Sequence, residues 1–204
     1  MYVVQEVFRD LSVQCNGNHK KSVLVFEQLC HSCGACELVC EPDAITFSPR
    51  IIGRIEQGET DGFAVKRGIL NVGEHMGVPI IKELLDDLPQ GDNILDCPPG
   101  TSCNVVNTIK YADKALLVTE QSVFGLHDLI LAIELLKRRE IPYGVVINKY
   151  KPTETIIFDY LNESGIPIIG TIEYSREAAV CYSKGNMLID IVGYQKQFIH
   201  IQDN

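Results

Sequence analysis

The amino-acid sequence predicts an α/β protein in which a small cysteine-rich segment precedes a larger domain with a parallel β-sheet. Two observations support this prediction. Four cysteines fall within the short, turn-rich stretch from Cys30 to Cys40. From about residue 78 onward, apolar stretches of strand length alternate with segments of helical periodicity. Strands that alternate with helices are typical of right-handed βαβ crossovers, and these crossovers produce a parallel sheet.

The first 73 residues are expected to be mainly strands and turns. Residues 1–49 form the cysteine-rich segment: Ser22–Phe26 is predicted as the strand that leads into the cysteine loop, and Ala44–Phe47 as the strand that leaves it. A strand, a cysteine loop, a short helix and a returning strand resemble half of a bacterial-type ferredoxin. Residues 50–73 alternate apolar and polar side chains around Gly58–Gly62, which predicts a β-hairpin that connects to the rest of the domain.

The larger domain, residues 50–204, contains the alternating elements. Apolar residues at helical spacing, and short buried-strand stretches between them, define its order. The predicted helices span residues 80–88, 105–111, 126–139, 156–163, 176–183 and 195–200, and the predicted strands span 93–96, 115–119, 143–148 and 166–169.

Composition excludes several classes of protein. The chain has 204 residues, of which 46% are hydrophobic, enough for the core of one ordinary domain with a small insert. No stretch approaches the ~20 apolar residues that span a bilayer. Eight cysteines without an export signal predict reduced thiols and a cytoplasmic location. The formal net charge of −9 argues against nucleic acid as a partner, because phosphate binding requires a basic face.

The cysteine spacing predicts a [4Fe–4S] cluster. Cys30, Cys33, Cys36 and Cys40 follow the pattern C-x2-C-x2-C-x3-C. Two-residue gaps let three thiolates converge on one cluster, and the fourth cysteine, which we expect on the following short helix, ligates a neighbouring cluster in two-cluster ferredoxins. Structural zinc is the main alternative, although zinc sites usually bring two C-x2-C pairs separated by a longer loop. A disulfide suits residues this close in a tight loop less well than a metal does.

Two polar motifs follow predicted strands, where the chemistry of parallel sheets is usually found. Asp96 precedes a Pro-Pro-Gly turn, so its carboxylate can lie near a nucleotide-bound magnesium ion while Gly100 offers a backbone N–H to a phosphate. Asn148 and Lys149 end another strand, and an asparagine amide can pair with the edge of adenine. The alternatives are a plain turn capped by Asp96 and a polar strand terminator at Asn148.

Six segments in order resemble the MinD/Mrp-like P-loop ATPases that carry an inserted ferredoxin domain. They are LCHSCGACELVC, RIIGRIEQGETDGF, GILNVGEHMGVP, LDCPPGTSC, ADKALLVTEQSVFGLHDLILAIELL and GVVINK, and the resemblance extends from about residue 20 to the C-terminus. It implies a doubly wound, mostly parallel sheet. It also implies that Asp96 acts as the switch II aspartate, Gly100 as a phosphate-sensing glycine and Asn148 as the adenine-reading residue. Lys149, next to Asn148, is a further candidate for nucleotide binding. Family members often form homodimers across the nucleotide.

The sequence departs from this family in its phosphate loop. No G-x-x-x-x-G-K-[ST] motif occurs, although that motif supplies most phosphate contacts and the magnesium-binding hydroxyl. We therefore expect Mg-ATP to bind only if a missing N-terminal segment supplies the loop. Either the chain is a truncated form, or it is a relative that no longer binds ATP, and the sequence leaves both open.

The first cysteine motif of a two-cluster domain is also absent. In that arrangement, its last cysteine would complete the cluster held by Cys30, Cys33 and Cys36. Cys15 is the only cysteine upstream, so Cys15 and Cys40 are the candidates for the fourth ligand, and the remaining alternative is a cluster with one iron that has no protein ligand.

Two functions from different classes follow. The first is an ATPase-class iron–sulfur protein that couples nucleotide state to electron transfer or cluster delivery, with a redox protein or an iron–sulfur client as partner. The second is a non-enzymatic electron-transfer or cluster-binding module, which requires only the cysteines.

Overall fold

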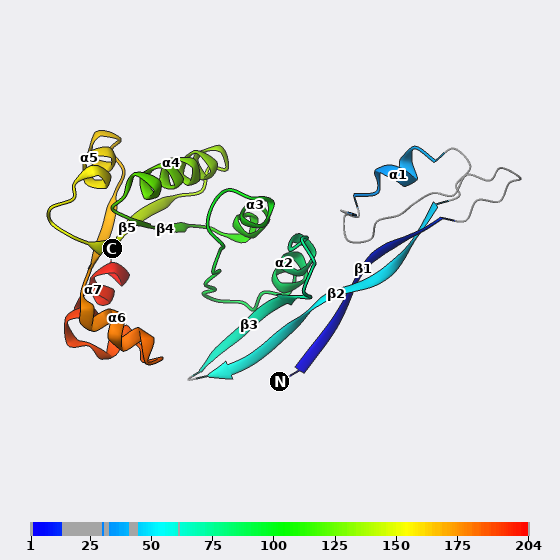
Figure 1. Cartoon of the computed structure of the whole chain (residues 1–204), viewed down its shortest axis with the longest axis horizontal. Helices are drawn as coiled ribbons and strands as arrows, with labels where there is room; N and C mark the ends of the chain where they lie inside the picture. Colours follow the sequence, from blue (N-terminus) through cyan, green and yellow to red (C-terminus); the bar gives the residue numbers. More distant parts are fainter. Residues whose placement is uncertain (1, 14–29, 31–32, 41–44, 61, 204) are drawn as a thin grey trace, which may run out of the picture. The chain divides into compact units, whose positions relative to one another are not determined.

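The computed structural model describes residues 2–13, 30, 33–40, 45–60 and 62–203. They divide into two compact units (Figure 1). The first unit comprises Met1–Cys97 with Val106–Thr108, and the second comprises Pro98–Val105 with Ile109–Asn204. In the described part of the chain, no helix has the length and apolar character needed to cross a membrane.

The first unit is built on an antiparallel sheet of three strands in the order β1-β2-β3. Its strands are β1 (Tyr2–Val13), β2 (Ile45–Thr60) and β3 (Phe63–Leu70). The turn between β2 and β3 contains Gly62 at φ 82°, a conformation that glycine adopts without steric cost. The predicted hairpin at residues 50–73 is therefore confirmed, and β2 runs through residues 49 and 50, where the sequence suggested a boundary.

Helix α2 (Val78–Leu85) packs against this hairpin through Ile80. A Cβ atom built on Gly53 would lie 2.4 Å from Ile80 Cδ1, and one built on Gly68 would lie 2.1 Å from Ile80 Cγ2. The two glycines of β2 and β3 thus make room for the isoleucine, so the helix can approach the strands closely.

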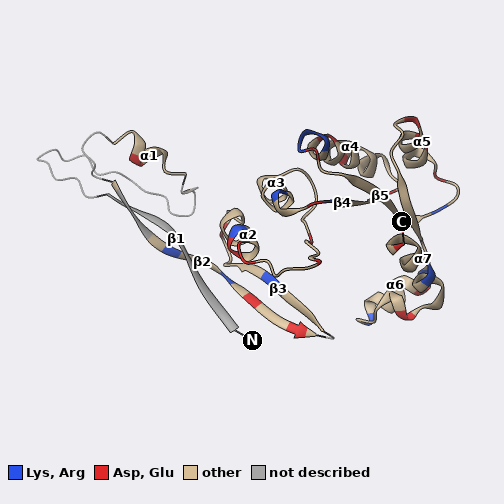
Figure 2. Ribbon diagram, turned by 180° about the vertical axis from the view of Figure 1, so that it is seen from behind, with Lys and Arg blue, Asp and Glu red and all other residues tan. Residues whose placement is uncertain are grey.

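Strand β2 carries residues of both charges, whereas the charged residues of β3 are basic (Figure 2). Glu56 accepts hydrogen bonds from Arg54 Nε at 2.8 Å and from Arg67 Nη2 at 2.7 Å. These bonds, made by the charged guanidinium groups, lower the pKa of Glu56. Arg50 and Glu74 form a second, bidentate ion pair.

The second unit contains a parallel sheet of three strands in the order β4-β5-β6, which confirms the α/β prediction. The strands are β4 (Ala115–Glu120), β5 (Tyr143–Tyr150) and β6 (Ile168–Glu173). Helix α4 (Val123–Arg138) connects β4 to β5, and α5 (Ile156–Glu163) connects β5 to β6. The two helices and β5 enclose one apolar core, which consists of Leu129, Ile133, Val145, Ile147, Ile157, Leu161 and Ile166.

The remaining elements of the second unit lie before β4 and after β6. Helix α3 (Cys103–Thr108), whose residues Val106–Thr108 are grouped with the first unit, precedes the short 3-10 helix η2 (Ile109–Tyr111). After β6 come α6 (Arg176–Ser183), η3 (Leu188–Asp190) and α7 (Val192–Gln202). Helix α7 packs on β6, where a Cβ atom on Gly170 would lie 2.7 Å from Ile201 Cγ1. All of these helices except η3 overlap a helix that the sequence predicts.

Two predictions about local structure are wrong. Residues 93–96 do not form a strand, and Ile94 is 98% exposed. A four-residue strand depends on a neighbouring strand for its stability, and none of the described strands pairs with these residues. Cys40 was expected on the short helix after the cysteine loop, but that helix, α1 (Ala35–Leu38), ends before it. The predicted strand Ser22–Phe26 lies outside the described residues.

Candidate functional site

The cysteine segment turns at Gly34, which adopts φ 80° between Cys33 and Cys36. Helix α1 begins directly after this glycine and carries Cys36, and the backbone N–H of Cys40 donates to Glu37 O at 3.2 Å just beyond the helix. Cys33 is exposed, whereas Cys30, Cys36 and Cys40 are half-buried. All four are free cysteines, so none is held in a disulfide.

The donor set of this segment fits an iron–sulfur cluster in its chemistry, because four thiols lie close in sequence and none of them is in a disulfide. The described residues do not gather three or more His, Cys, Asp or Glu side chains into one metal-binding group. Cys15, the other candidate for the fourth ligand, lies outside the described residues. The [4Fe–4S] site thus stays a prediction.

A second cluster of polar side chains lies where β4 and β5 end. In the parallel ladder Glu120 is the register partner of Asn148, so the two side chains emerge at the same edge of the sheet. Lys149 Nζ lies 2.6 Å from Glu120 Oε1, and the backbone N–H of Lys149 donates to Asn148 Oδ1 at 2.9 Å. Lys149 adopts φ 52°, a left-handed conformation that is uncommon for a residue with a side chain. The structure therefore brings together Glu120, Asn148 and Lys149.

Gln121 joins the loop after β4 to the loop after β5. Its side chain is 8% exposed, and both ends of its amide are used. The oxygen accepts from the backbone N–H of Lys151 at 2.7 Å, and Nε2 donates to the carbonyl of Glu154. Lys151 Nζ also lies 3.2 Å from Glu154 Oε1 and 5.6 Å from the centre of the Tyr174 ring. Gln121 thus fixes the loop that follows Lys149, a role that the sequence analysis did not identify.

Asp96 precedes the Pro-Pro-Gly turn, and Gly100 is the glycine of that turn. Asp96 is an exposed residue of the first unit, and Gly100 is an exposed residue of the second at φ 87°. Between them Cys97 is half-buried, and burial raises the pKa of its thiol. The Asp96 carboxylate acts in the same direction, whereas a hydrogen bond with Thr108 opposes it. A thiol with a raised pKa stays protonated and poorly reactive, which fits a structural cysteine.

Comparison with known proteins relates this chain to MinD-like proteins. It is 31% identical over 170 residues to the uncharacterized protein MJ0579 of Methanocaldococcus jannaschii, an alignment that covers 82% of this chain and 59% of that protein. It is 29% identical over 105 residues to the putative septum site-determining protein MinD of Nephroselmis olivacea, covering 47% of this chain and 38% of that protein. The chain therefore spans less than two thirds of the length of either relative.

Among solved structures, the MinD cell division protein of Aquifex aeolicus matches 49% of this chain and 46% of its own length, with 21% identity and a TM-score of 0.44. No family model matches the chain. The sequence similarities support the MinD-like part of the resemblance described above.

Replacing Gln121 by methionine is expected to lower the free energy of unfolding by about 1–3 kcal/mol, because it leaves the Lys151 N–H and the Glu154 carbonyl without their partner. Urea denaturation measures this change, and limited proteolysis should show faster cleavage within residues 151–155. Gln195 on α7 is exposed, so the same substitution there should change stability by less than about 0.5 kcal/mol. Equal unfolding midpoints for the two variants would show that the Gln121 amide does not hold the loop.

Proposed function

We propose that this chain is an iron–sulfur protein with a MinD-like α/β body, which couples nucleotide state to electron transfer or cluster delivery. The observation that carries the proposal is the C-x2-C-x2-C-x3-C spacing of Cys30, Cys33, Cys36 and Cys40. The free state of these four cysteines and the left-handed turn at Gly34 support it. In this proposal the partner is a redox protein or an iron–sulfur client, and the chain functions as a homodimer.

When bound, a [4Fe–4S] cluster supplies one-electron redox chemistry. Cys30, Cys33 and Cys36 would hold it, with Cys40 or Cys15 as the fourth ligand. The chain's own contribution is to supply the thiolates and to expose this segment to a partner. Leu38 is 88% exposed and Val39 is 78% exposed beside Cys40, so apolar surface suited to a docking protein lies next to the proposed ligands.

Two of the proposed nucleotide contacts, Asn148 and Lys149, lie at the carboxyl end of β5, and the other two, Asp96 and Gly100, lie in the loop before α3. Asn148 would read the base, Lys149 would contact the nucleotide, Gly100 would donate its backbone N–H to a phosphate, and Asp96 would hold magnesium through its carboxylate. Glu120 and Gln121 would position this edge: Glu120 pairs with the Lys149 ammonium, and Gln121 fixes the loop that follows. In this proposal Mg-ATP requires a phosphate loop from a further polypeptide segment, because the sequence contains none.

Anaerobic reconstitution with iron and sulfide tests the cluster. We expect brown protein with about four irons per chain, and Cys33→Ala should abolish the colour because it removes a ligand. Cys181→Ala is the matched control, since Cys181 lies on α6 and its thiol bonds to the Met187 carbonyl at 3.5 Å, so the colour should remain. Stoichiometric zinc without visible absorbance would contradict the proposal.

The same experiment identifies the fourth ligand. If Cys15 supplies it, Cys15→Ser loses or converts the cluster, while Cys40→Ser leaves it mostly intact; if Cys40 supplies it, the effects are reversed. Iron counts and electron paramagnetic resonance of the reduced variants separate the two. A wild-type signal from two interacting clusters would contradict both assignments.

The second candidate function, a cluster-binding module without ATP binding, is favoured by one observation: no G-x-x-x-x-G-K-[ST] motif occurs in the 204 residues. Calorimetry with Mg-ATP distinguishes it. We expect weak or no binding to the chain as it stands, because most phosphate contacts in P-loop proteins come from that loop. Micromolar affinity would instead show that the carboxyl edge binds nucleotide without it.

A further inference from the structure

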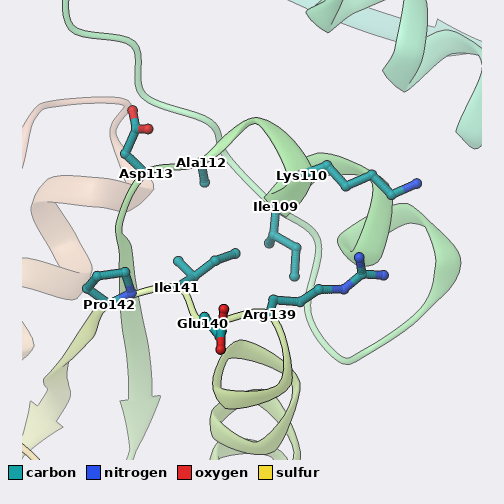
Figure 3. Close-up of a pocket in the computed structure, with 8 residues that line it drawn as sticks. All are labelled: Ile109, Lys110, Ala112, Asp113, Arg139, Glu140, Ile141 and Pro142. Carbon is teal, nitrogen blue, oxygen red and sulfur yellow. The ribbon is translucent and has the colours of Figure 1, made fainter.

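One edge of the parallel sheet in the second unit is open. Strand β4 pairs with β5 along its whole length, from Ala115 to Glu120, and no other described strand pairs with it. Figure 3 shows the start of this strand, where the chain runs from Asp113 into β4 near Pro142. The ladder between β4 and β5 has no register shift, whereas the ladder between β5 and β6 shifts at two places. Strand β4 therefore offers a regular edge to a further strand.

The backbone of β4 directs alternate residues toward this edge. The N–H of Ala115 donates to Pro142 O at 2.9 Å, directly before β5 begins, so Ala115 turns its backbone polar groups toward β5. Because consecutive residues of a strand alternate, the N–H and C=O groups of Leu116 and Val118 point away from β5. These donors and acceptors are available for pairing with a strand of another chain.

The side chains of Leu116 and Val118 form an apolar strip beside the same edge. They are 53% and 60% exposed. Val118 is the register partner of Val146 in β5, which lies on the same face of the sheet and is 1% exposed. The layer that covers this face over β5 therefore does not extend over β4. Soluble proteins usually cover apolar side chains on an open edge strand.

Strand β4 also lacks the features that prevent pairing between sheet edges. Such edges usually carry a lysine, a proline or a bulge. The six residues of β4, ALLVTE, contain neither lysine nor proline, and their one charged residue is the last. The opposite edge strand, β6, is covered by α7, since a Cβ atom on Gly170 would lie 2.7 Å from Ile201 Cγ1. The two edges of the sheet thus differ, and β4 is the edge suited to pairing.

The sequence of β4 is complementary to itself when two copies pair antiparallel about Leu117. In this register, Leu116 of one copy lies opposite Val118 of the other, and the two-fold symmetry repeats this apolar pair. Both residues direct their backbone groups to the edge, so each pair exchanges two hydrogen bonds. All four side chains lie on the open face, where each covers its neighbour across the new ladder.

Charge selects this register over its neighbours. Alternation along the strand places Lys114 and Glu120 on the face of the apolar strip, and pairing about Leu117 brings Lys114 of one copy opposite Glu120 of the other. Lys114 is exposed and forms none of the ion pairs found among the described residues. Pairing about Leu116 or Val118 instead would set Val118 opposite Lys114, or Leu116 opposite Glu120, and would lose both matches.

We propose that β4 is a self-association surface, through which two copies of this chain join their three-stranded sheets into one continuous sheet. The strands β4 of the two copies pair antiparallel about Leu117, with the apolar strips in contact and a Lys114–Glu120 pair at each end. A six-residue edge makes a small interface, and small interfaces are typical of weak complexes. The dimer should therefore form between micromolar and millimolar concentrations of the chain.

Sedimentation velocity of the full 204-residue chain under reducing conditions, without nucleotide or iron, tests the proposal. The fraction of dimer should rise with concentration. Val118→Lys should weaken dimerisation at least about tenfold, because it replaces an apolar cross-strand partner by a charge at two symmetric positions. Val65→Lys is the matched control, since Val65 is 50% exposed on β3, and its dimer affinity should stay within about twofold of wild type.

A charge exchange tests the register. Lys114→Glu and Glu120→Lys should each weaken the dimer about fivefold, because each sets like charges opposite one another at both ends of the ladder. The variant with both substitutions restores opposite charges, so its affinity should return to within about twofold of wild type. In 15N–1H spectra, the amides of Leu116 and Val118 should exchange more slowly with solvent as the concentration of the chain rises.

Four results would overturn the proposal. They are a monomer throughout this concentration range, equal dimer affinities of Val118→Lys and Val65→Lys, and a charge-exchanged variant that dimerises no better than the single variants. The fourth is protection of the Leu116 and Val118 amides in a monomer, which would show that another segment of the same chain covers the edge. Because the assay involves neither iron nor ATP, its outcome is independent of the proposed cluster and nucleotide functions.

Discussion

Replacing Leu161 by alanine is expected to lower the free energy of unfolding of the second unit by about 2–5 kcal/mol. Leu161 is 0% exposed and belongs to the core that α4, α5 and β5 enclose. Shortening it removes buried methyl groups and leaves a cavity that neighbours such as Ile157 fill only partly. Urea denaturation followed by far-ultraviolet circular dichroism measures the change.

The matched control is Ile156→Ala on the same helix. Ile156 is 37% exposed, so its truncation removes less buried apolar surface than that of Leu161. We expect the free energy of unfolding to fall by less than about 1 kcal/mol. If the two variants lost similar free energies of unfolding, Leu161 would not be buried in the core of α4, α5 and β5.

The second large effect is expected for Gly125→Ala at the start of α4. A Cβ atom at this position would lie 2.3 Å from the backbone oxygen of Glu120 and 3.2 Å from Ser122 Oγ. Ser122 caps the helix by accepting from the Gly125 N–H at 2.9 Å, so the clash falls on the cap itself. A backbone atom cannot move aside easily. We therefore expect the free energy of unfolding to fall by about 1–3 kcal/mol and the Glu120–Lys149 ion pair to be disturbed.

Gly193→Ala in α7 provides the comparison, because a Cβ atom there meets nothing within 4 Å. Alanine is the better helix former, so this variant should be more stable than wild type by about 0.5–1 kcal/mol. Thermal unfolding of the two variants gives the sign of each change. A stabilised Gly125→Ala variant would contradict the close approach between Glu120 and the first turn of α4.

Local sequence patterns predict the elements of the second unit well. Leu129, Ile133 and Leu136 recur at helical spacing in α4, and Val145–Ile147 form a continuous apolar run typical of a strand buried on both faces. The local pattern alone shows which of these residues face the core. Their burial can therefore be predicted without knowledge of distant segments.

Elements that depend on distant partners were harder to predict. Strand β1 pairs with β2 across the chain, with Tyr2 opposite Gln57, and the predicted strand at 93–96 did not form. In both cases pairing with another segment decides whether the strand exists, and a single sequence does not contain that information.

At the candidate site, Asn148 and Lys149 were predicted from their position at a strand end, and the structure brings them together with Glu120. Gln121 was missed because its role arises from two hydrogen bonds to a loop 30 residues later in the sequence. The signal available was a glutamine directly between a predicted strand and a predicted helix. Such a residue is either exposed or must satisfy both ends of its amide.

The position of β5 between β4 and β6 implies a gradient of amide hydrogen exchange across the sheet. Val145, Val146 and Ile147 are at most 1% exposed and pair with strands on both sides, so their amides should exchange only when the whole unit opens. In β4, Leu116 and Val118 are 53% and 60% exposed, and the described strands pair with it on one side. Its amides should therefore exchange through smaller fluctuations, so that β4, which ends at Glu120, can adjust while β5, which carries Asn148, stays fixed.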